Sequence, residues 1–150
     1  AHFTGDAVYT GAGSVLSVSG GNLEIVDTTL WTMTAASLAE VTGGDLLFSG
    51  TPVAALDAST FSVKDGSVSM ALATDVTLAN ASLLEVSGGG LSFADTTTFS
   101  AYDSGVFVSG GQVHHADDTV VYLERSTVTV NGASVARAPG DLLLLSQRTR

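Results

Sequence analysis

The stretch LLEVSGGGLSFADTTTF, residues Leu83–Phe99, occurs twice in this chain, because LAEVTGGDLLFSGTPV at Leu38–Val53 is an imperfect copy of it. In each copy a short segment alternates between apolar and polar residues and ends at a valine. A glycine-rich corner follows, and a second apolar segment begins five residues after the valine. Alternation of this kind is typical of a β-strand with one buried face.

The same unit fills nearly the whole chain of 150 residues. Its valine recurs at intervals of 22 or 23 residues, and a serine stands four residues before each valine. The valines are Val18, Val41, Val63, Val86, Val108 and Val130, and the serines are Ser14, Ser37, Ser59, Ser82, Ser104 and Ser126. Internal repetition at this period indicates that each copy is one coil of a solenoid.

Each unit contains short apolar segments separated by corners rich in Gly, Asp and Thr, and it has no helical periodicity. We therefore predict an all-β fold, a single-stranded parallel β-helix (β-solenoid) of about six coils of 22–23 residues with three short strands per coil. Left-handed coils are typically built from hexapeptides, so this period favours a right-handed coil. Residues 1–150 are expected to form a single domain, and to be a segment of a longer protein.

Strand parity predicts which side chains face the core. The valines and the residues two positions before them should point inward, while the residues between them, such as Ser62, should point outward. In the second strand the residues five and seven positions after the valine should point inward, which includes His115 and Arg137 in the last copies. Trp31 and Phe107 are expected to be exposed aromatics.

The serines fall at a corner, where a small hydroxyl can bond to neighbouring backbone or to the serine of the next coil. We therefore interpret the serines and valines as structural ladders. Corner threonines are likewise expected to bond to the backbone.

The chain is strongly acidic, with 15 Asp and Glu against 5 Lys and Arg, a net charge of -10. Such a surface repels phosphate backbones and anionic lipid, so we expect no nucleic-acid partner. No apolar run reaches membrane-spanning length, so no membrane insertion is expected. There are no cysteines. Apart from Lys64, the basic residues lie within the last 26 positions: Arg125, Arg137, Arg148 and Arg150.

Two His and two Asp lie within five positions and are candidate ligands for a divalent metal: His114, His115, Asp117 and Asp118. Adjacent residues on a strand point to opposite faces, so the two histidines cannot share one ion without a bulge. Asp117 aligns with corner aspartates in other copies, which favours a role in the turn. The sequence therefore predicts no metal ligand and no cofactor.

Glu40 and Glu85 share an outward column but lie two coils apart, about 10 Å by strand spacing. Carboxylate pairs of glycosidases lie about 5 Å or about 6.5–9.5 Å apart. No Lys or Arg stands in that column, so no catalytic residue is predicted. Asn80-Ala81-Ser82 is a glycosylation sequon on a turn, which makes Asn80 a candidate modification site.

Four copies carry a Gly-Gly pair followed by another residue and an aliphatic one: Gly20-Gly21-Asn22-Leu23, Gly43-Gly44-Asp45-Leu46, Gly88-Gly89-Gly90-Leu91 and Gly110-Gly111-Gln112-Val113. This pattern resembles right-handed parallel β-helix surface proteins, such as autotransporter passenger domains and polymorphic membrane proteins. The resemblance covers about residues 13–145, although the Phe-x-x-Asn motif of that group is missing. It implies an extracellular or cell- or virion-surface stalk, adhesin or shell component, with no catalytic residues to carry over.

The function expected from these observations is a structural or adhesive module, a rigid spacer or building block in a surface assembly. The alternative is a β-helix protein that binds or cleaves carbohydrate, of the pectate-lyase-like type. A third possibility is a filament subunit joined end to end. Because an uncapped solenoid exposes strand edges, we expect its ends to meet other protein chains or further coils of the same chain. The late arginines favour a head-to-tail contact that salt weakens.

Overall fold

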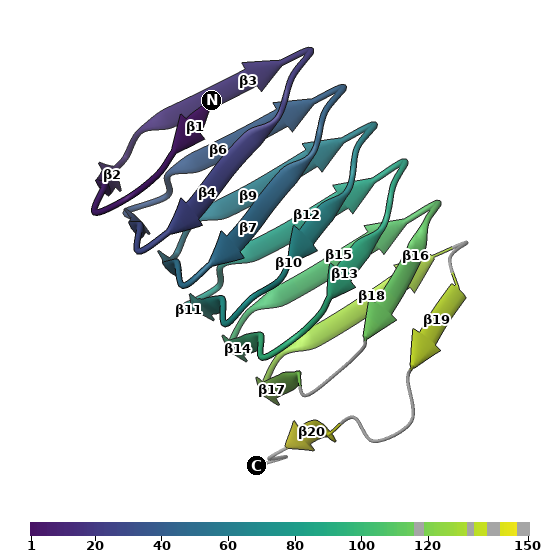
Figure 1. Ribbon diagram of the computed structural model, residues 1–150. Coiled ribbons are helices and arrows are strands. Elements are labelled where there is room, and N and C mark those ends of the chain that lie inside the picture. Colours follow the sequence, from purple (N-terminus) through teal and green to yellow (C-terminus); the bar gives the residue numbers. More distant parts are fainter. Residues whose placement is uncertain (116–118, 132–133, 138–141, 147–150) are drawn as a thin grey trace.

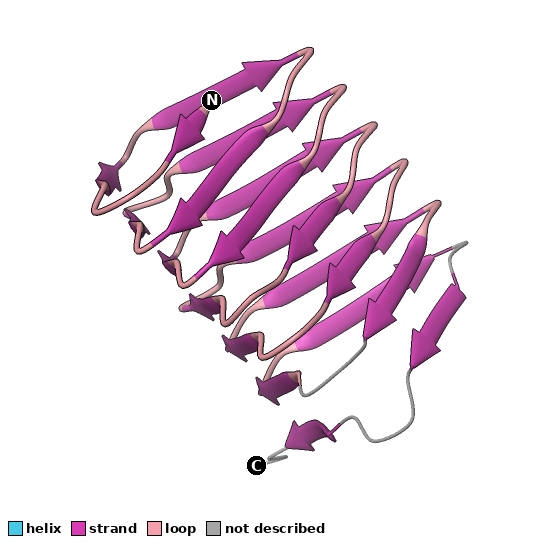
Figure 2. Cartoon of the chain, in the orientation of Figure 1, coloured by secondary structure: helices cyan, strands magenta, loops and turns pink. Residues whose placement is uncertain are grey.

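The computed structural model describes residues 1–115, 119–131, 134–137 and 142–146; for His115 and for residues 134–137 and 142–146 the description covers the backbone. In these ranges all the regular elements are β-strands (Figure 2). The strands wind into coils that stack from β1 at one end to β20 at the other (Figure 1). The predicted all-β solenoid of about six coils, with three strands per coil, is confirmed.

Three parallel sheets form the walls of the solenoid. Sheet A contains β1 (His2–Phe3), β4 (Leu23–Asp27), β7 (Leu46–Gly50), β10 (Val68–Met70), β13 (Leu91–Phe93), β16 (Gln112–His115) and β19 (Ser134–Arg137). Sheet B contains β2 (Val8–Ala12), β5 (Leu30–Thr34), β8 (Val53–Asp57), β11 (Asp75–Ala79), β14 (Thr98–Tyr102), β17 (Val120–Glu124) and β20 (Leu142–Ser146). Sheet C contains β3 (Val15–Ser19), β6 (Leu38–Thr42), β9 (Thr60–Lys64), β12 (Leu83–Ser87), β15 (Gly105–Ser109) and β18 (Thr127–Asn131).

Each coil pairs with the next in the register that the repeat predicts. Val41 has Val18 and Val63 as its Cα partners on the flanking strands. The chain start follows the same rule, since Val8 pairs with Leu30, 22 residues later. Parallel strands about 4.8 Å apart therefore place equivalent residues in columns that run along the solenoid.

In the middle of the stack, the core is formed by the residues predicted to point inward from the first two strands of each repeat unit, which belong to sheets C and A. The buried members include the valines and the second-strand residues: Val41, Val63, Val86, Val108, Ile25, Phe48, Met70 and Phe93. Val128 lies in the predicted inward column, in register with the buried Val106, and is 42% exposed because β18 is the last described strand of its sheet. The side chains of His115 and Arg137 lie outside the described part of the chain.

Trp31 was expected to be exposed, and this expectation is wrong: its side chain is 0% exposed. On β5 the alternation places Trp31 and Met33 inside and Leu30 outside. The indole ring stacks on the ring of Tyr9, with centroids 3.9 Å apart and an angle of 18° between the planes. The tryptophan is therefore a core residue near the N-terminal end. Phe107, on β15, is half-buried.

Ser62 was expected on the solvated outer face, but it is only 4% exposed. Its hydroxyl lies 3.5 Å from Glu85 Oε2, so longer side chains of the neighbouring coils cover it. A short residue between longer neighbours in one column loses contact with solvent although it is not in the core.

Candidate functional site

Hydrogen bonds join successive coils at the serine corner, although the N–H of Ser82 donates within its own coil, to Ala79 O at 3.2 Å. The hydroxyl oxygen of Ser59 accepts a bond from the backbone N–H of Ser37 at 3.2 Å, and the hydroxyl donates to Asp57 O at 2.8 Å. The same N–H to Oγ contact joins Ser14 to Ser37, Ser59 to Ser82, and Ser104 to Ser126. Each of these hydroxyls is hydrogen-bonded to the backbone, so the serines have a structural role.

A second column, at the corner between sheets C and A, is built from glycines whose backbones stack closely. An ideal Cβ on any of four of them would lie 1.8–2.2 Å from a carbonyl oxygen of the preceding coil: Gly44, Gly66, Gly89 and Gly111. Gly21 occupies the equivalent place in the first coil, and a Cβ built there meets nothing within 4 Å. The sixth copy has Ala133 at this position, which lies outside the described residues.

The threonine corner, between sheets A and B, also bonds to the backbone. The hydroxyls of Thr29, Thr74 and Thr97 each donate to the carbonyl three residues earlier at 2.7 Å, and all three residues are buried. These threonines hold turns between β-strands.

The predicted column that contains Glu40 and Glu85, two coils apart, is confirmed, since Ser62 is the Cα partner of both. Lys64 Nζ nevertheless lies 2.5 Å from Glu40 Oε1, and this hydrogen bond raises the pKa of the lysine. Lys64 stands in the neighbouring column, and its side chain is long enough to reach Glu40 diagonally, which positions within a single column do not reveal. Glu40 is thereby engaged in an ion pair, which weakens the case for an enzymatic carboxylate pair.

The metal candidate can be placed only in part. His114 and His115 lie on β16, whose backbone pairs with β13 and β19, while Asp117 and Asp118 lie outside the described residues. Elsewhere in the described ranges, no three His, Asp or Glu side chains gather in a way that could hold a metal ion.

The sequon lies on the serine corner. Asn80 is exposed, and its Nδ2 donates to Asp57 Oδ1 at 2.7 Å. Ser82, whose hydroxyl a glycosylating enzyme must read, is 1% exposed and donates to Ala79 O at 2.6 Å. In the folded protein, therefore, the asparagine is accessible and the serine is not.

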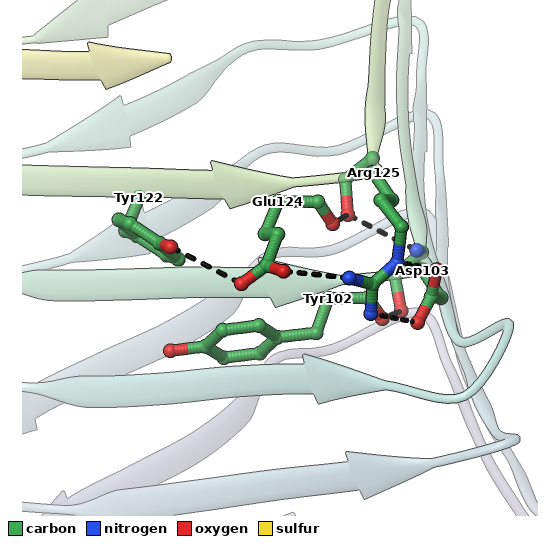
Figure 3. A network of polar contacts seen from close by, with 7 residues as sticks. Tyr102, Asp103, Tyr122, Glu124 and Arg125 are labelled. Atoms are coloured by element: carbon green, nitrogen blue, oxygen red, sulfur yellow. Dashed lines mark hydrogen bonds and ion pairs between the residues drawn. The ribbon is translucent and has the colours of Figure 1, made fainter. Parts of the chain in front are cut away.

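A polar network on the surface links the ends of β14 and β17 (Figure 3). Arg125 donates through Nε and one terminal nitrogen to both oxygens of Asp103, at 2.6 Å each. Its other terminal nitrogen donates to Glu124 Oε1 at 2.6 Å. The guanidinium lowers the pKa of Asp103, and the two carboxylates raise the pKa of Arg125 further. One of the four late arginines is thus already paired within its own chain.

Two tyrosines adjoin this network on the outer face of sheet B. Tyr122 OH donates to Glu124 Oε2 at 3.2 Å, which ties its ring to the charged group. The ring of Tyr102 lies beside it, with centroids 5.5 Å apart and a 46° angle between the planes (Figure 3). Tyr122 pairs in register with Ser100, a small residue on the coil before. This pair could not be predicted from the sequence, because the third strand of the coil has no anchor residue that assigns its faces.

Comparison with protein-family models, with curated proteins and with solved structures finds no match for this chain. Among the described residues, no helix is long and apolar enough to span a membrane.

Proposed function

We propose that this chain is a structural module of an extracellular or surface assembly, a rigid spacer or building block made of stacked coils. The observation that carries the proposal is the register of three parallel sheets along the solenoid, with serine hydrogen bonds between coils at one corner and closely packed glycines at another. Such a stack is rigid along its axis, because each coil is held in register by its neighbours, and a stalk or shell component requires this rigidity. The resemblance to autotransporter passenger domains points to the same location and role.

Antibody labelling of the cells that make this protein tests the proposal. The antibody should label intact cells, and brief protease treatment of intact cells should remove the signal. A signal that appears only after the cells are opened would contradict a surface role.

The tyrosine pair favours a second candidate function, the binding of a neutral polysaccharide. Tyr102 and Tyr122 offer two adjacent rings, and the network beside them offers fixed hydrogen-bonding groups. Aromatic rings with a polar rim suit a flat ligand that has an apolar face and hydroxyl edges. Asp103 and Glu124 outnumber the single cation Arg125, so an anionic sugar should be repelled.

Affinity electrophoresis in gels that contain hydroxyethylcellulose tests this second function, with polygalacturonate as the anionic comparison. The neutral polymer should retard the chain, and Tyr102→Ala or Tyr122→Ala should weaken the retardation at least tenfold. Phe107→Ala removes a half-buried aromatic from a different sheet and serves as the matched control. Equal loss in all three variants, or retardation by polygalacturonate alone, would contradict binding at the tyrosines.

A further inference from the structure

The sequon at Asn80 lies on a corner that is one residue longer than the same corner of the two adjacent coils. Two residues, Asn80 and Ala81, separate the end of β11 from the serine of this corner. In the coil before and in the coil after, a single residue fills this place: Ala58 and Asp103. Asn80 and Ala81 have positive φ, 53° and 64°, and both are exposed. The longer corner therefore leaves the asparagine side chain at the surface of the solenoid.

The side-chain amide of Asn80 can carry a substituent without leaving its place in the folded corner. Its Nδ2 donates one hydrogen bond, to Asp57 Oδ1 at 2.7 Å. An amide nitrogen of this kind has two hydrogens, so one remains that a substituent can replace. Because the side chain is exposed, a bulky group attached there extends into solvent and not into the core. The folded structure is therefore compatible with a glycan on this nitrogen.

The serine of the same sequon is closed off once the coil has folded. Ser82 is 1% exposed, and its hydroxyl donates to Ala79 O at 2.6 Å. The same hydroxyl oxygen accepts a bond from the backbone N–H of Ser59 at 3.2 Å. An enzyme that glycosylates Asn80 must bind this hydroxyl as well, because both residues define the acceptor sequence. The corner must therefore be open when the glycan is attached.

The order of synthesis leaves this corner open for a time. β12, which follows the sequon directly, pairs with β15, and the N–H of Ala81 donates to Asp103 O at 2.8 Å. These partners belong to the next coil, so the ribosome makes them after the sequon. Chains are made from the N-terminus at about 5–20 residues per second, and pairing between residues distant in sequence is slow. The sequon is therefore exposed as unfolded chain before its coil can close.

From these observations we propose that Asn80 is an acceptor site for an N-linked oligosaccharide, which is attached before the coil that contains Ser82 folds. The transferase joins Asn80 Nδ2 to the anomeric carbon of an oligosaccharide carried on a lipid diphosphate. The bond from that carbon to the diphosphate oxygen breaks, the lipid diphosphate leaves, and one proton of Nδ2 passes to a base of the enzyme. The inference rests on the proposed surface location, because N-glycosylation belongs to secreted chains.

Synthesis of the whole chain in a translation extract tests the site, with a cleavable signal peptide in front of the chain and endoplasmic-reticulum microsomes present. The product should carry a single glycan, which peptide N-glycosidase removes with an increase in gel mobility. Asn80→Gln should abolish this glycan. Asn131→Gln is the matched control and should leave it in place, because Asn131 is an exposed asparagine without Ser or Thr two positions later.

The timing is tested by adding the purified, folded chain to microsomes opened with detergent. The folded chain should be glycosylated at least tenfold less than the chain that is synthesised in the presence of microsomes, because Ser82 is closed off. Val86→Asp, which the buried position of Val86 makes strongly destabilising, should restore glycosylation of the added chain, since it opens the coil.

The glycosylated chain should give the same far-ultraviolet circular dichroism as the chain without glycan, because the glycan lies outside the core. No glycan during synthesis would overturn the inference, as would equal glycosylation of the folded chain or a glycosylated chain that fails to fold. Since the microsomes supply the secretory location, a failure here concerns Asn80 alone. The surface labelling experiment decides the proposed function separately.

Discussion

The carbonyl oxygen of Gly44 lies 1.8 Å from the position that a Cβ atom on Gly66 would occupy. A methyl group at position 66 would therefore overlap the backbone of Gly44, and relieving the overlap would require the two coils to separate at this corner. We therefore expect Gly66→Ala to lower the free energy of unfolding by about 3 kcal/mol, as overpacking against backbone does. Gly21→Ala is the matched control, since its methyl group meets nothing in the isolated chain, and it should cost less than about 0.5 kcal/mol. Urea titration at low protein concentration measures both, and equal midpoints would contradict the stacking at this corner.

Because inward and outward residues alternate, the same substitution at two neighbouring positions should change the free energy of unfolding by very different amounts. Val86 is 0% exposed, so Val86→Asp buries an unpaired carboxylate and should cost several kcal/mol, about 4 or more. Ser87→Asp, one residue later, places its carboxylate on the outer face, beside its register partner Lys64, and should change stability by less than about 0.5 kcal/mol. Thermal unfolding followed by circular dichroism compares the two; similar melting temperatures would show that the face assignment is wrong.

The serine corner should contribute measurably to stability. Ser59→Ala removes the acceptor of the Ser37 N–H in a buried corner, which should cost about 1–3 kcal/mol. Ser69→Ala, on the half-buried outer side of β10, is the control and should be close to neutral. Urea unfolding of the two variants tests the contribution, and a Ser59→Ala variant as stable as the control would show that the ladder does not stabilise the solenoid.

Acid should release the ion pair at the end of sheet B. The guanidinium of Arg125 lowers the pKa of Asp103 below its ordinary value of 3.8 in the folded chain. A lowered folded pKa means that the stabilising effect is present above about pH 4 and is lost as the pH falls through the folded pKa. Carbon-13 NMR of the Asp103 carboxyl should therefore give a midpoint below 3.8, and Arg125→Gln should return it to the ordinary range. A midpoint that is the same in both proteins would mean that the pair does not form in solution.

Much of the fold could be predicted because the repeat fixes register directly. A spacing of 22 residues between Val8 and Leu30 is enough to place one above the other. Trp31 was misplaced because the third strand has no anchor residue from which to count parity. The Lys64–Glu40 contact depends on the reach of a flexible side chain across two columns, which column positions alone do not encode.

The candidate sites were less predictable than the fold. The network of Arg125 with Asp103 and Glu124 joins residues on neighbouring coils at a corner, and it forms only because β14 and β17 end at the same level. The difference between Gly21 and Gly44 is invisible in the sequence, since both are the second glycine of a pair. It appears only when the carbonyl of the adjacent coil is in place.

Distances between spin labels along one outer column test the stacked coil architecture most directly. The chain has no cysteines, so pairs of introduced cysteines can be labelled cleanly, and Ser19, Ser87, Ser109 and Asn131 belong to one column in register. Pulsed electron paramagnetic resonance from Ser19→Cys to Ser87→Cys, Ser109→Cys and Asn131→Cys should give narrow distributions. Their centres should increase by about 4.8 Å per coil, from about 14 Å to about 19 Å and about 24 Å between backbones. Broad distributions, or distances that do not grow in equal steps, would contradict the stacked solenoid.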